Sequence, residues 1–268
     1  MASRSSCRYQ TEGVEITPPY KKLASYYRKI MEHVDYIDWA FYLTGLLKKH
    51  GREPCSLLEL GAGTGILSKH FKPVSIKQRV TTDISFEMIR CASPETAQHR
   101  AVVDAANLPF SGSFDMMLMT YDAINYLSRA AINSLFQEAF RLLSDTGVFI
   151  FDITTEYNSL TYFENAADVE ELGDDVIARR CWYEAFKHKQ YNQFDFFTLQ
   201  KDGSYLRETE VHEQNVYPVS FFKKAAENAS LEVEGIYADF STDTELSCAE
   251  RIHFVLSKKN KTSRGEVL

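Results

Sequence analysis

The sequence lacks any long apolar run and any paired cysteine motif. No stretch of its 268 residues approaches the roughly 20 apolar residues that a membrane-spanning helix needs. The first residues also contain no apolar run, so they do not predict a secretory signal. The cysteines are scattered and odd in number, which is typical of reduced thiols in a cytoplasmic protein and excludes a cysteine-based zinc site. They are Cys7, Cys55, Cys91, Cys181 and Cys248.

Positive charge is in deficit, with 30 Lys and Arg residues against 37 Asp and Glu residues and a net charge of -7. Because the basic residues are dispersed, a polyanion would meet repulsion, and we expect neither a nucleic acid nor a membrane partner. The seven histidines show no metal-ligand spacing, so no metal site is expected. The basic cluster Lys258-Lys259-Asn260-Lys261 is interpreted as part of a flexible tail at 259–268.

Hydrophobic residues make up 44% of the chain, enough for one large core, and their spacing alternates between two periods. Helical spacing between residues 20 and 50 predicts two helices, and Gly51 follows as a stop signal. Beyond it, short apolar runs alternate with helical segments, which is typical of a parallel sheet covered by helices on both faces. The predicted strands are 55–60, 78–82, 100–103, 114–119 and 148–153, and the predicted helices are 66–71, 85–92 and 130–143.

The pattern changes after the fifth predicted strand. Three extended segments between about 176 and 216 lack a helical period, and Lys201-Asp202-Gly203 predicts a hairpin turn between the last two. Pro218 predicts the start of a helix that runs to about Asn228, and strands follow at 231–238 and 251–257. We therefore expect an α/β fold with a mostly parallel seven-stranded sheet and an antiparallel β insertion after its fifth strand.

A glycine-rich turn follows the first of these strands, in the segment LELGAGTG at 58–65. Such a turn lets a ligand approach the backbone, and the helix start behind it presents free N–H groups to anionic atoms. A nicotinamide-binding GxGxxG pattern would need a third glycine at Ile66 or Ser68, and neither is glycine. Asp83 ends the next strand about 20 residues on, where an acid can bind ribose hydroxyls or cap a helix.

These elements, in this order, resemble the motifs of class I S-adenosylmethionine-dependent methyltransferases. The resemblance covers residues 55–152 and includes DAANLPF at 104–110, SFD at 113–115, YDAINYL at 121–127 and LLSDTGVFIFD at 142–152. It implies a Rossmann-like fold, S-adenosyl-L-methionine as cofactor and S-adenosyl-L-homocysteine as product. It also implies that Asp83 binds the ribose, that Asp104 meets the adenine amino group, and that the backbone N–H of Ala105 meets a ring nitrogen. The other expected cofactor contacts are Glu59, Gly61, Gly63 and Tyr121.

A looser resemblance precedes the glycine turn. Residues 20–39 look like the N-terminal helices of small-molecule methyltransferases of the glycine N-methyltransferase type. There an aromatic side chain from a lid helix covers the cofactor, a role that the resemblance gives to Tyr27. Met88 stands where such enzymes place an apolar residue against the adenine, although ordinary helix packing would also explain it.

Methyl transfer is a direct displacement from an activated sulfonium, so the protein mainly aligns the reactants and needs a base only if the acceptor must lose a proton. The acceptor is expected beyond the carboxyl ends of the strands, near Tyr121, Asp122, Asn125, Tyr126 and Asp152.

The antiparallel insertion is expected to form the roof of the acceptor site. By strand alternation, one face of its last strand carries Glu208, Glu210, His212 and Gln214. His212 is a candidate base, or else a half-exposed residue of the sheet. Trp182 is a candidate acceptor contact. Together with Phe194 and Phe196, it could instead serve as packing.

The segment Thr17-Pro18-Pro19-Tyr20 is similar to a motif of methyltransferases that act on nucleobase amines. That motif should follow a strand, whereas this segment precedes a helix, so we interpret Pro19 as a helix start.

The sequence thus predicts a methyltransferase that forms an N-methyl or O-methyl product from a small molecule. A non-catalytic cofactor-binding subunit and a methyltransferase of RNA or protein remain alternatives, and the oligomeric state is open. We expect a single domain over 1–268. Its expected parts are N-terminal lid helices at 18–51, a cofactor-binding core at 52–153, a substrate roof at 154–217, a final helix and strands at 218–258, and the tail.

Overall fold

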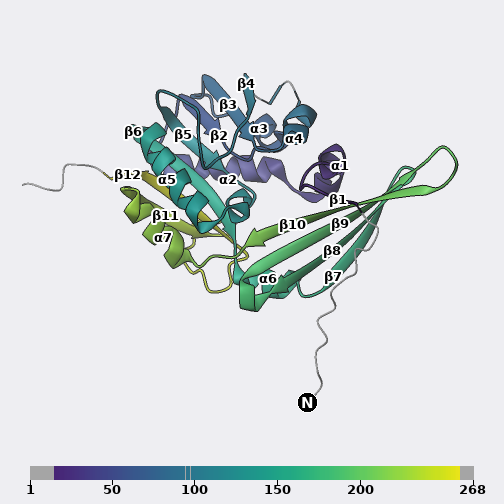
Figure 1. The fold of residues 1–268 in the computed structure, drawn as a ribbon. Coiled ribbons are helices and arrows are strands. Elements are labelled where there is room, and N and C mark those ends of the chain that lie inside the picture. Colours follow the sequence, from purple (N-terminus) through teal and green to yellow (C-terminus); the bar gives the residue numbers. More distant parts are fainter. Residues whose placement is uncertain (1–14, 94, 97, 260–268) are drawn as a thin grey trace, which may run out of the picture.

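Two β-sheets and the helices around them make up the computed structural model, which describes residues 15–93, 95, 96 and 98–259 (Figure 1). Cys7 and the tail beyond Lys259 lie outside the described residues. Within them, no helix is long and apolar enough to cross a membrane.

The larger sheet has seven strands in the order β11-β12-β6-β5-β2-β3-β4. The pairs from β6 through β4 are parallel, and β12 and β11 continue the sheet in antiparallel pairing. This confirms the predicted fold class. The strands are β2 (Ser56–Glu59), β3 (Gln78–Asp83), β4 (His99–Val102), β5 (Phe114–Met119), β6 (Leu143–Thr154), β11 (Leu231–Ala238) and β12 (Arg251–Lys258).

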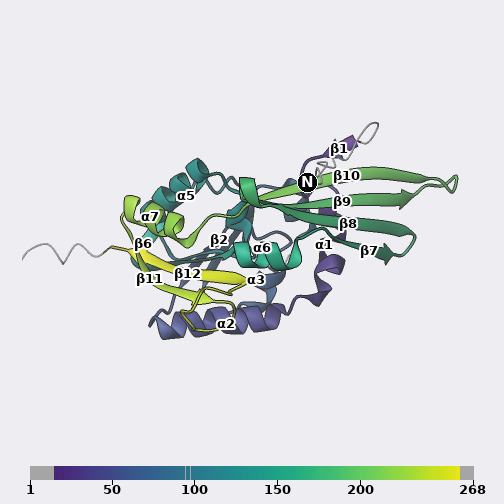
Figure 2. The same ribbon diagram turned by 90° about the horizontal axis from the view of Figure 1, so that it is seen from below.

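Helices cover both faces of this sheet (Figure 2). On one face, α5 (Arg129–Leu142) and α7 (Val219–Asn228) pack on Met117 and Phe149. On the other, α2 (Tyr36–Lys49) and α3 (Ile66–His70) pack on Met116 and Val148. Because neighbouring residues of β5 and β6 enter opposite cores, both strands are continuously apolar, and this is the pattern that made them predictable.

The smaller sheet has five strands in the order β1-β10-β9-β8-β7. The three extended segments predicted between about 176 and 216 are present as β8, β9 and β10, which pair antiparallel. The sequence did not predict β7, which pairs antiparallel with β8, or β1, which adds a parallel edge beside β10. The predicted turn at 201–203 joins β9 to β10, with Gly203 at φ 82°. The strands are β1 (Glu15–Thr17), β7 (Ala166–Leu172), β8 (Asp175–Glu184), β9 (Lys189–Leu199) and β10 (Tyr205–Asn215).

Short helices connect the sheets to the rest of the chain. They are α1 (Leu23–Ile30), η1 (Met31–His33), α4 (Phe86–Cys91), η2 (Ala123–Tyr126), α6 (Glu156–Tyr162) and η3 (Ala185–Lys187). The interpretation of Pro19 as a helix start is wrong, because α1 begins at Leu23 and a turn with Tyr20 at φ 63° intervenes.

Candidate functional site

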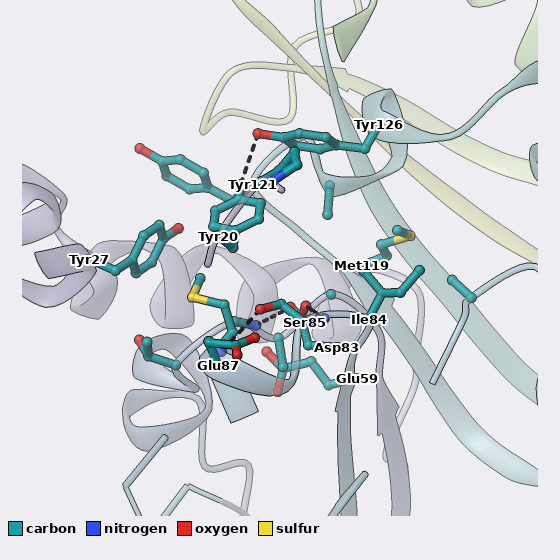
Figure 3. Close-up of a pocket in the computed structure, with 18 of the residues that line it drawn as sticks. Tyr20, Tyr27, Glu59, Asp83, Ile84, Ser85, Glu87, Met119, Tyr121 and Tyr126 are labelled. Atoms are coloured by element: carbon teal, nitrogen blue, oxygen red, sulfur yellow. Dashed lines mark hydrogen bonds between the residues drawn. The ribbon is translucent and has the colours of Figure 1, made fainter. Parts of the chain in front are cut away.

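A cavity of about 650 Å³ lies where β2, β3 and β5 end (Figure 3). Its wall contains the glycine turn, the residues that follow β3, β4 and β5, and Tyr20 and Tyr27 from the N-terminal segment. The carboxyl ends of parallel strands meet at one edge of a sheet, and ligands of open α/β sheets bind there. All nine residues expected to contact a cofactor line this one cavity: Tyr27, Glu59, Gly61, Gly63, Asp83, Met88, Asp104, Ala105 and Tyr121.

The glycine turn has no room for side chains at Gly61 and Gly63. Gly61 and Gly63 adopt left-handed φ values of 60° and 58°. A Cβ atom on Gly61 would lie 2.9 Å from the Cβ of Ala123, and one on Gly63 would lie 3.1 Å from the Cε of Met88. The turn is therefore a bare cradle in which the backbone itself faces the cavity.

Asp83 fastens this cradle to the next element. Its Oδ2 accepts a hydrogen bond from the Gly63 N–H at 2.8 Å, and its Oδ1 accepts one from the Ser85 N–H at 2.8 Å. Ser85, not Asp83, is the N-cap of α4, because its hydroxyl accepts from the Met88 N–H. Burial raises the pKa of Asp83, although the two N–H bonds oppose that rise. A carboxylate has about four acceptor positions, so it retains capacity toward the cavity.

Glu59 lies beneath the cradle and is only 2% exposed. Its carboxylate accepts a hydrogen bond from the Ser68 hydroxyl, and Arg79 lies near enough to oppose the rise that burial causes in its pKa. At the other side of the cavity, the side chain of Asp104 is exposed and accepts a hydrogen bond from the Ala106 N–H at 2.9 Å. The side chain of Met88, which also lines the cavity, is buried. The wall thus combines carboxylates, bare backbone and an apolar side chain.

The turn after β5 is held by a buried ion cluster. Tyr121 and Asp122 are both left-handed, at φ 61° and 49°. The carboxylate of Asp152 accepts the N–H groups of both, at 2.7 and 2.8 Å. Arg251 bridges the carboxylates of Asp122 and Asp152. Asp152 is fully buried and lines neither this cavity nor the next, so it positions the Tyr121 turn and makes no contact with an acceptor in either cavity.

A second cavity of about 300 Å³ adjoins the first. Tyr20, Tyr27, Tyr121 and Tyr126 line both and so form the boundary between them. The rest of its wall comes from strands β7, β8, β9 and β10 of the five-stranded sheet and from other elements, which include α1 and η1. Its polar wall residues include Arg179, Gln190, Asn192, His212 and Gln214.

His212 lies in this second cavity's wall and is not the half-exposed sheet residue of the alternative interpretation, since it is 1% exposed. Its Nδ1 lies 3.2 Å from the Tyr126 hydroxyl, and its Nε2 lies 3.2 Å from Oε2 of Glu210. The Tyr126 hydroxyl in turn lies 2.9 Å from that of Tyr20, which donates to it. Burial raises the pKa of both tyrosines, so they stay protonated at neutral pH.

Glu210 also connects the five-stranded sheet to the first turn of α1. Its carboxylate accepts hydrogen bonds from the N–H groups of Tyr20 at 3.0 Å, Leu23 at 3.1 Å and Lys22. These N–H groups lie at the helix start, where no intrahelical partner exists. The helix that carries Tyr27 is thus held by a strand almost 200 residues away in the sequence.

Two predicted acceptor contacts lie elsewhere. Asn125 is fully buried, donates to the Asn215 carbonyl at 2.7 Å and accepts from the Thr154 N–H at 3.1 Å, so its amide joins backbone segments. Trp182 stacks on Tyr191 with ring centroids 5.0 Å apart, on the face of the sheet opposite to the second cavity.

Sequence reasoning missed the segment before α1. Pro18, Pro19 and Tyr20 line the first cavity, although the sequence favoured a purely structural role for them. Two consecutive prolines stiffen the backbone ahead of an aromatic side chain, and that stiffness was the available signal. In the described residues, no three His, Cys, Asp or Glu side chains gather as metal ligands would.

Comparison with known proteins agrees with this geometry. Residues 57–147 match the family described as a methyltransferase domain. The candidate methyltransferase YqeM of Bacillus subtilis is 26% identical over 254 residues, which cover 91% of this chain and 98% of YqeM. A candidate methyltransferase of Geobacillus sp. is also 26% identical, over 89% of this chain and 99% of its own length.

Solved structures share the fold. An S-adenosylmethionine-dependent methyltransferase from Clostridium acetobutylicum has a TM-score of 0.76 at 23% identity and covers 90% of this chain and 99% of its own. The sugar N-methyltransferase KedS8 from Streptoalloteichus sp. has a TM-score of 0.73 at 18% identity, with coverages of 97% and 99%. Both sheets therefore belong to a fold that these proteins have in common.

Proposed function

We propose that this chain, which carries a methyltransferase domain and has the fold of S-adenosylmethionine-dependent methyltransferases, moves a methyl group to nitrogen or oxygen of a small molecule by direct displacement. It is an enzyme whose cofactor is S-adenosyl-L-methionine and whose product is S-adenosyl-L-homocysteine. The N-terminal helices, like those of the glycine N-methyltransferase type, close the site through Tyr27.

One observation carries the proposal: the glycine turn and Asp83 meet at the same cavity, joined by the hydrogen bond from the Gly63 N–H to Oδ2 of Asp83. The obstructed Cβ positions of Gly61 and Gly63 suit a ligand that contacts backbone. In the proposed arrangement Asp83 holds the ribose, Asp104 and Ala105 bind the adenine against Met88, and Glu59 supports the turn. Bound there, the cofactor supplies an activated methyl group.

The acceptor occupies the second cavity, whose volume of about 300 Å³ suits a small molecule. Among the residues that the sequence placed near the acceptor, Tyr121, Asp122, Tyr126 and His212 line this cavity. Tyr126 and His212 are the proposed acceptor contacts. The likeness to a sugar N-methyltransferase is compatible with this class of acceptor. We further propose that the chain is one domain with the division given above and that it works in the cytoplasm without nucleic acid.

Calorimetry tests the cofactor site. Wild-type protein should bind S-adenosylmethionine and not NAD, and Asp83→Ala should weaken S-adenosylmethionine binding at least tenfold. Asp115→Ala is the matched control, because Asp115 also accepts backbone N–H bonds, from Cys55 and Ser56, but lies outside the cavity. Equal affinity in wild type and Asp83→Ala would refute the ribose role. A methyl-release assay against a metabolite library then identifies acceptors.

A further inference from the structure

A chain of hydrogen bonds runs from Tyr20 and Tyr126, at the boundary between the two cavities, to His212 and Glu210. Glu210 accepts N–H bonds from the start of α1 on both carboxylate oxygens, which is the arrangement of an ionised acceptor. His212 Nε2 must then carry the proton that faces Glu210, which leaves Nδ1 free to accept from the Tyr126 hydroxyl. Tyr126 accepts from Tyr20. The two hydroxyl bonds, from Tyr20 to Tyr126 and from Tyr126 to His212, are therefore both oriented to deliver a proton to Nδ1 of His212.

The second cavity itself favours a positively charged guest. Its described wall contains the carboxylates of Asp122, Asp168 and Glu170 and the guanidinium groups of Arg179 and Arg251. Arg251 is already bound to two carboxylates, and Arg179 lies 3.5 Å from Asp168. An anion would therefore meet an excess of negative charge. A cation would meet that charge and the aromatic rings at the boundary.

We propose that the acceptor is a small amine that enters the second cavity as an ammonium ion and gives its proton to His212 through Tyr20 and Tyr126. This inference rests on the proposed function and names its acceptor class. One N–H bond of the ammonium breaks, each hydroxyl passes a proton along, and an Nδ1–H bond forms on His212. The freed nitrogen lone pair then bonds to the methyl carbon, and the electron pair of the broken carbon–sulfur bond remains on sulfur.

The strength of the base selects an amine over an alcohol. In water an alkylammonium has a pKa of about 10.4 and an imidazole about 6.5, a gap of about four. An alcohol hydroxyl is close to water, with a pKa of about 15.7, so its gap to imidazole is about nine. A neutral histidine can therefore relieve an ammonium of its proton far more readily than it can ionise an alcohol.

Glu210 is a positioning residue in this scheme. It fixes the imidazole tautomer and balances the positive charge that His212 gains. Because it also holds the start of α1, the helix with Tyr27 and the proton acceptor are anchored by the same carboxylate.

Turnover provides the first test. Transfer of labelled methyl from S-adenosylmethionine is measured with ethanolamine, glucosamine and 2-phenylethylamine, each paired with its hydroxyl analogue (ethylene glycol, glucose and 2-phenylethanol). We expect transfer to amines only, and Tyr126→Phe should lower kcat about 100-fold without changing cofactor affinity. Tyr191→Phe, on the outer face of the sheet, should leave kcat unchanged. Transfer to the hydroxyl members, or a loss below threefold in Tyr126→Phe, would overturn the proposal.

A second test needs no acceptor. Nitrogen-15 NMR of full-length protein with S-adenosylhomocysteine should show His212 protonated on Nε2 and unprotonated on Nδ1, with the signal assigned by its loss in His212→Gln. Glu210→Gln should shift the tautomer balance toward Nδ1–H. A wild-type His212 protonated on Nδ1 would overturn the relay, while failure to bind the cofactor at all would instead refute the proposed function.

Discussion

At the scale of single residues, two glycines with the same backbone conformation have different surroundings. Gly51 and Gly63 have φ values of 61° and 58°. A Cβ on Gly51 would meet nothing within 4 Å, whereas one on Gly63 would lie 3.1 Å from the Met88 Cε. A left-handed alanine costs about 1 kcal/mol of stability, so both Gly→Ala variants should lose a similar amount.

Only the variant in the cavity should lose ligand affinity. We predict that Gly63→Ala raises the Kd for S-adenosylmethionine about tenfold or more, because its methyl group would occupy the cradle, and that Gly51→Ala leaves the Kd unchanged. Calorimetry measures both, with urea unfolding as the stability reference. Equal losses of affinity in the two variants would mean that strain alone acts and that the cradle is misassigned.

The burial of His253 predicts that the stability of the folded state depends on pH. It is fully buried among Trp39, Tyr42 and Phe240, and burial, aided by the charge of Arg251, lowers its pKa to about 3. Below the unfolded-state pKa of about 6.5, the unfolded chain binds a proton here that the folded chain does not. The folded state therefore loses stability as pH falls from about 6.5 toward 3.

The variant His253→Phe isolates this effect, since other titrating groups are common to both proteins. Between pH 7 and pH 5, wild type should lose about 2 kcal/mol of unfolding free energy relative to His253→Phe. Denaturant unfolding at the two pH values measures the difference. If the two proteins lost stability in parallel, His253 would not be the group responsible.

At the scale of elements, the turn after β5 is held in place by Asp152 on the neighbouring strand β6. Asp152 on β6 accepts the N–H groups of Tyr121 and Asp122 and bonds to Arg251. An asparagine at this position would keep one oxygen that can accept an N–H group, but its NH₂ group would face the other N–H donor. It would also remove the negative charge that Asp152 places beside Arg251. We predict that Asp152→Asn lowers the free energy of unfolding by about 3 kcal/mol.

Asp145 supplies the matched control on the same strand. Its side chain is fully exposed and lies 4.0 Å from Lys258, so Asp145→Asn should change stability by less than about 0.5 kcal/mol. Urea unfolding compares the two variants. Similar effects from both would show that the buried cluster is not a determinant of the turn.

The elements that sequence could predict are those with a strong apolar period. All seven strands of the larger sheet carry apolar runs between helical segments or turn signals, and each is present. Strand β7 escaped prediction because it is an exposed edge strand whose residues Asp168, Glu170 and Glu171 give no apolar alternation. Helix α6 has only seven residues, too few for a clear helical period.

The two halves of the candidate site differ in the same way. The cofactor side could be read from the sequence because Gly61 and Gly63 lie just past β2 and Asp83 ends β3, so that all three reach one edge of the sheet. The acceptor side depends on contacts such as Tyr20 with Glu210, which are 190 residues apart and leave no local pattern. Position after a strand does not reveal whether an amide faces a cavity or bonds to backbone, as the Asn125 amide does in the structure.

At the scale of the whole molecule, the first cavity is assembled from distant parts of the chain. The large sheet supplies the glycine turn, and the N-terminal segment, fixed to β10 by Glu210, supplies Tyr20 and Tyr27. A ligand that contacts both parts stabilises the folded state by RT ln(1 + [L]/Kd), about 2.7 kcal/mol at 100 times Kd. For a chain of this size, that corresponds to a rise in Tm of about 5–10 °C.

The same coupling between binding and folding predicts which segments should be protected from amide hydrogen exchange when the ligand binds. Saturating S-adenosylhomocysteine should slow amide hydrogen exchange in the glycine turn and also in α1, because Tyr27 on that helix covers the cavity. Strand β11 lines neither cavity and provides the internal reference, with exchange unchanged unless global unfolding dominates. Gly63→Ala, at the same ligand concentration, should show a much smaller rise in Tm. Protection of the glycine turn without protection of α1 would mean that the N-terminal helix does not take part in closing the cofactor site.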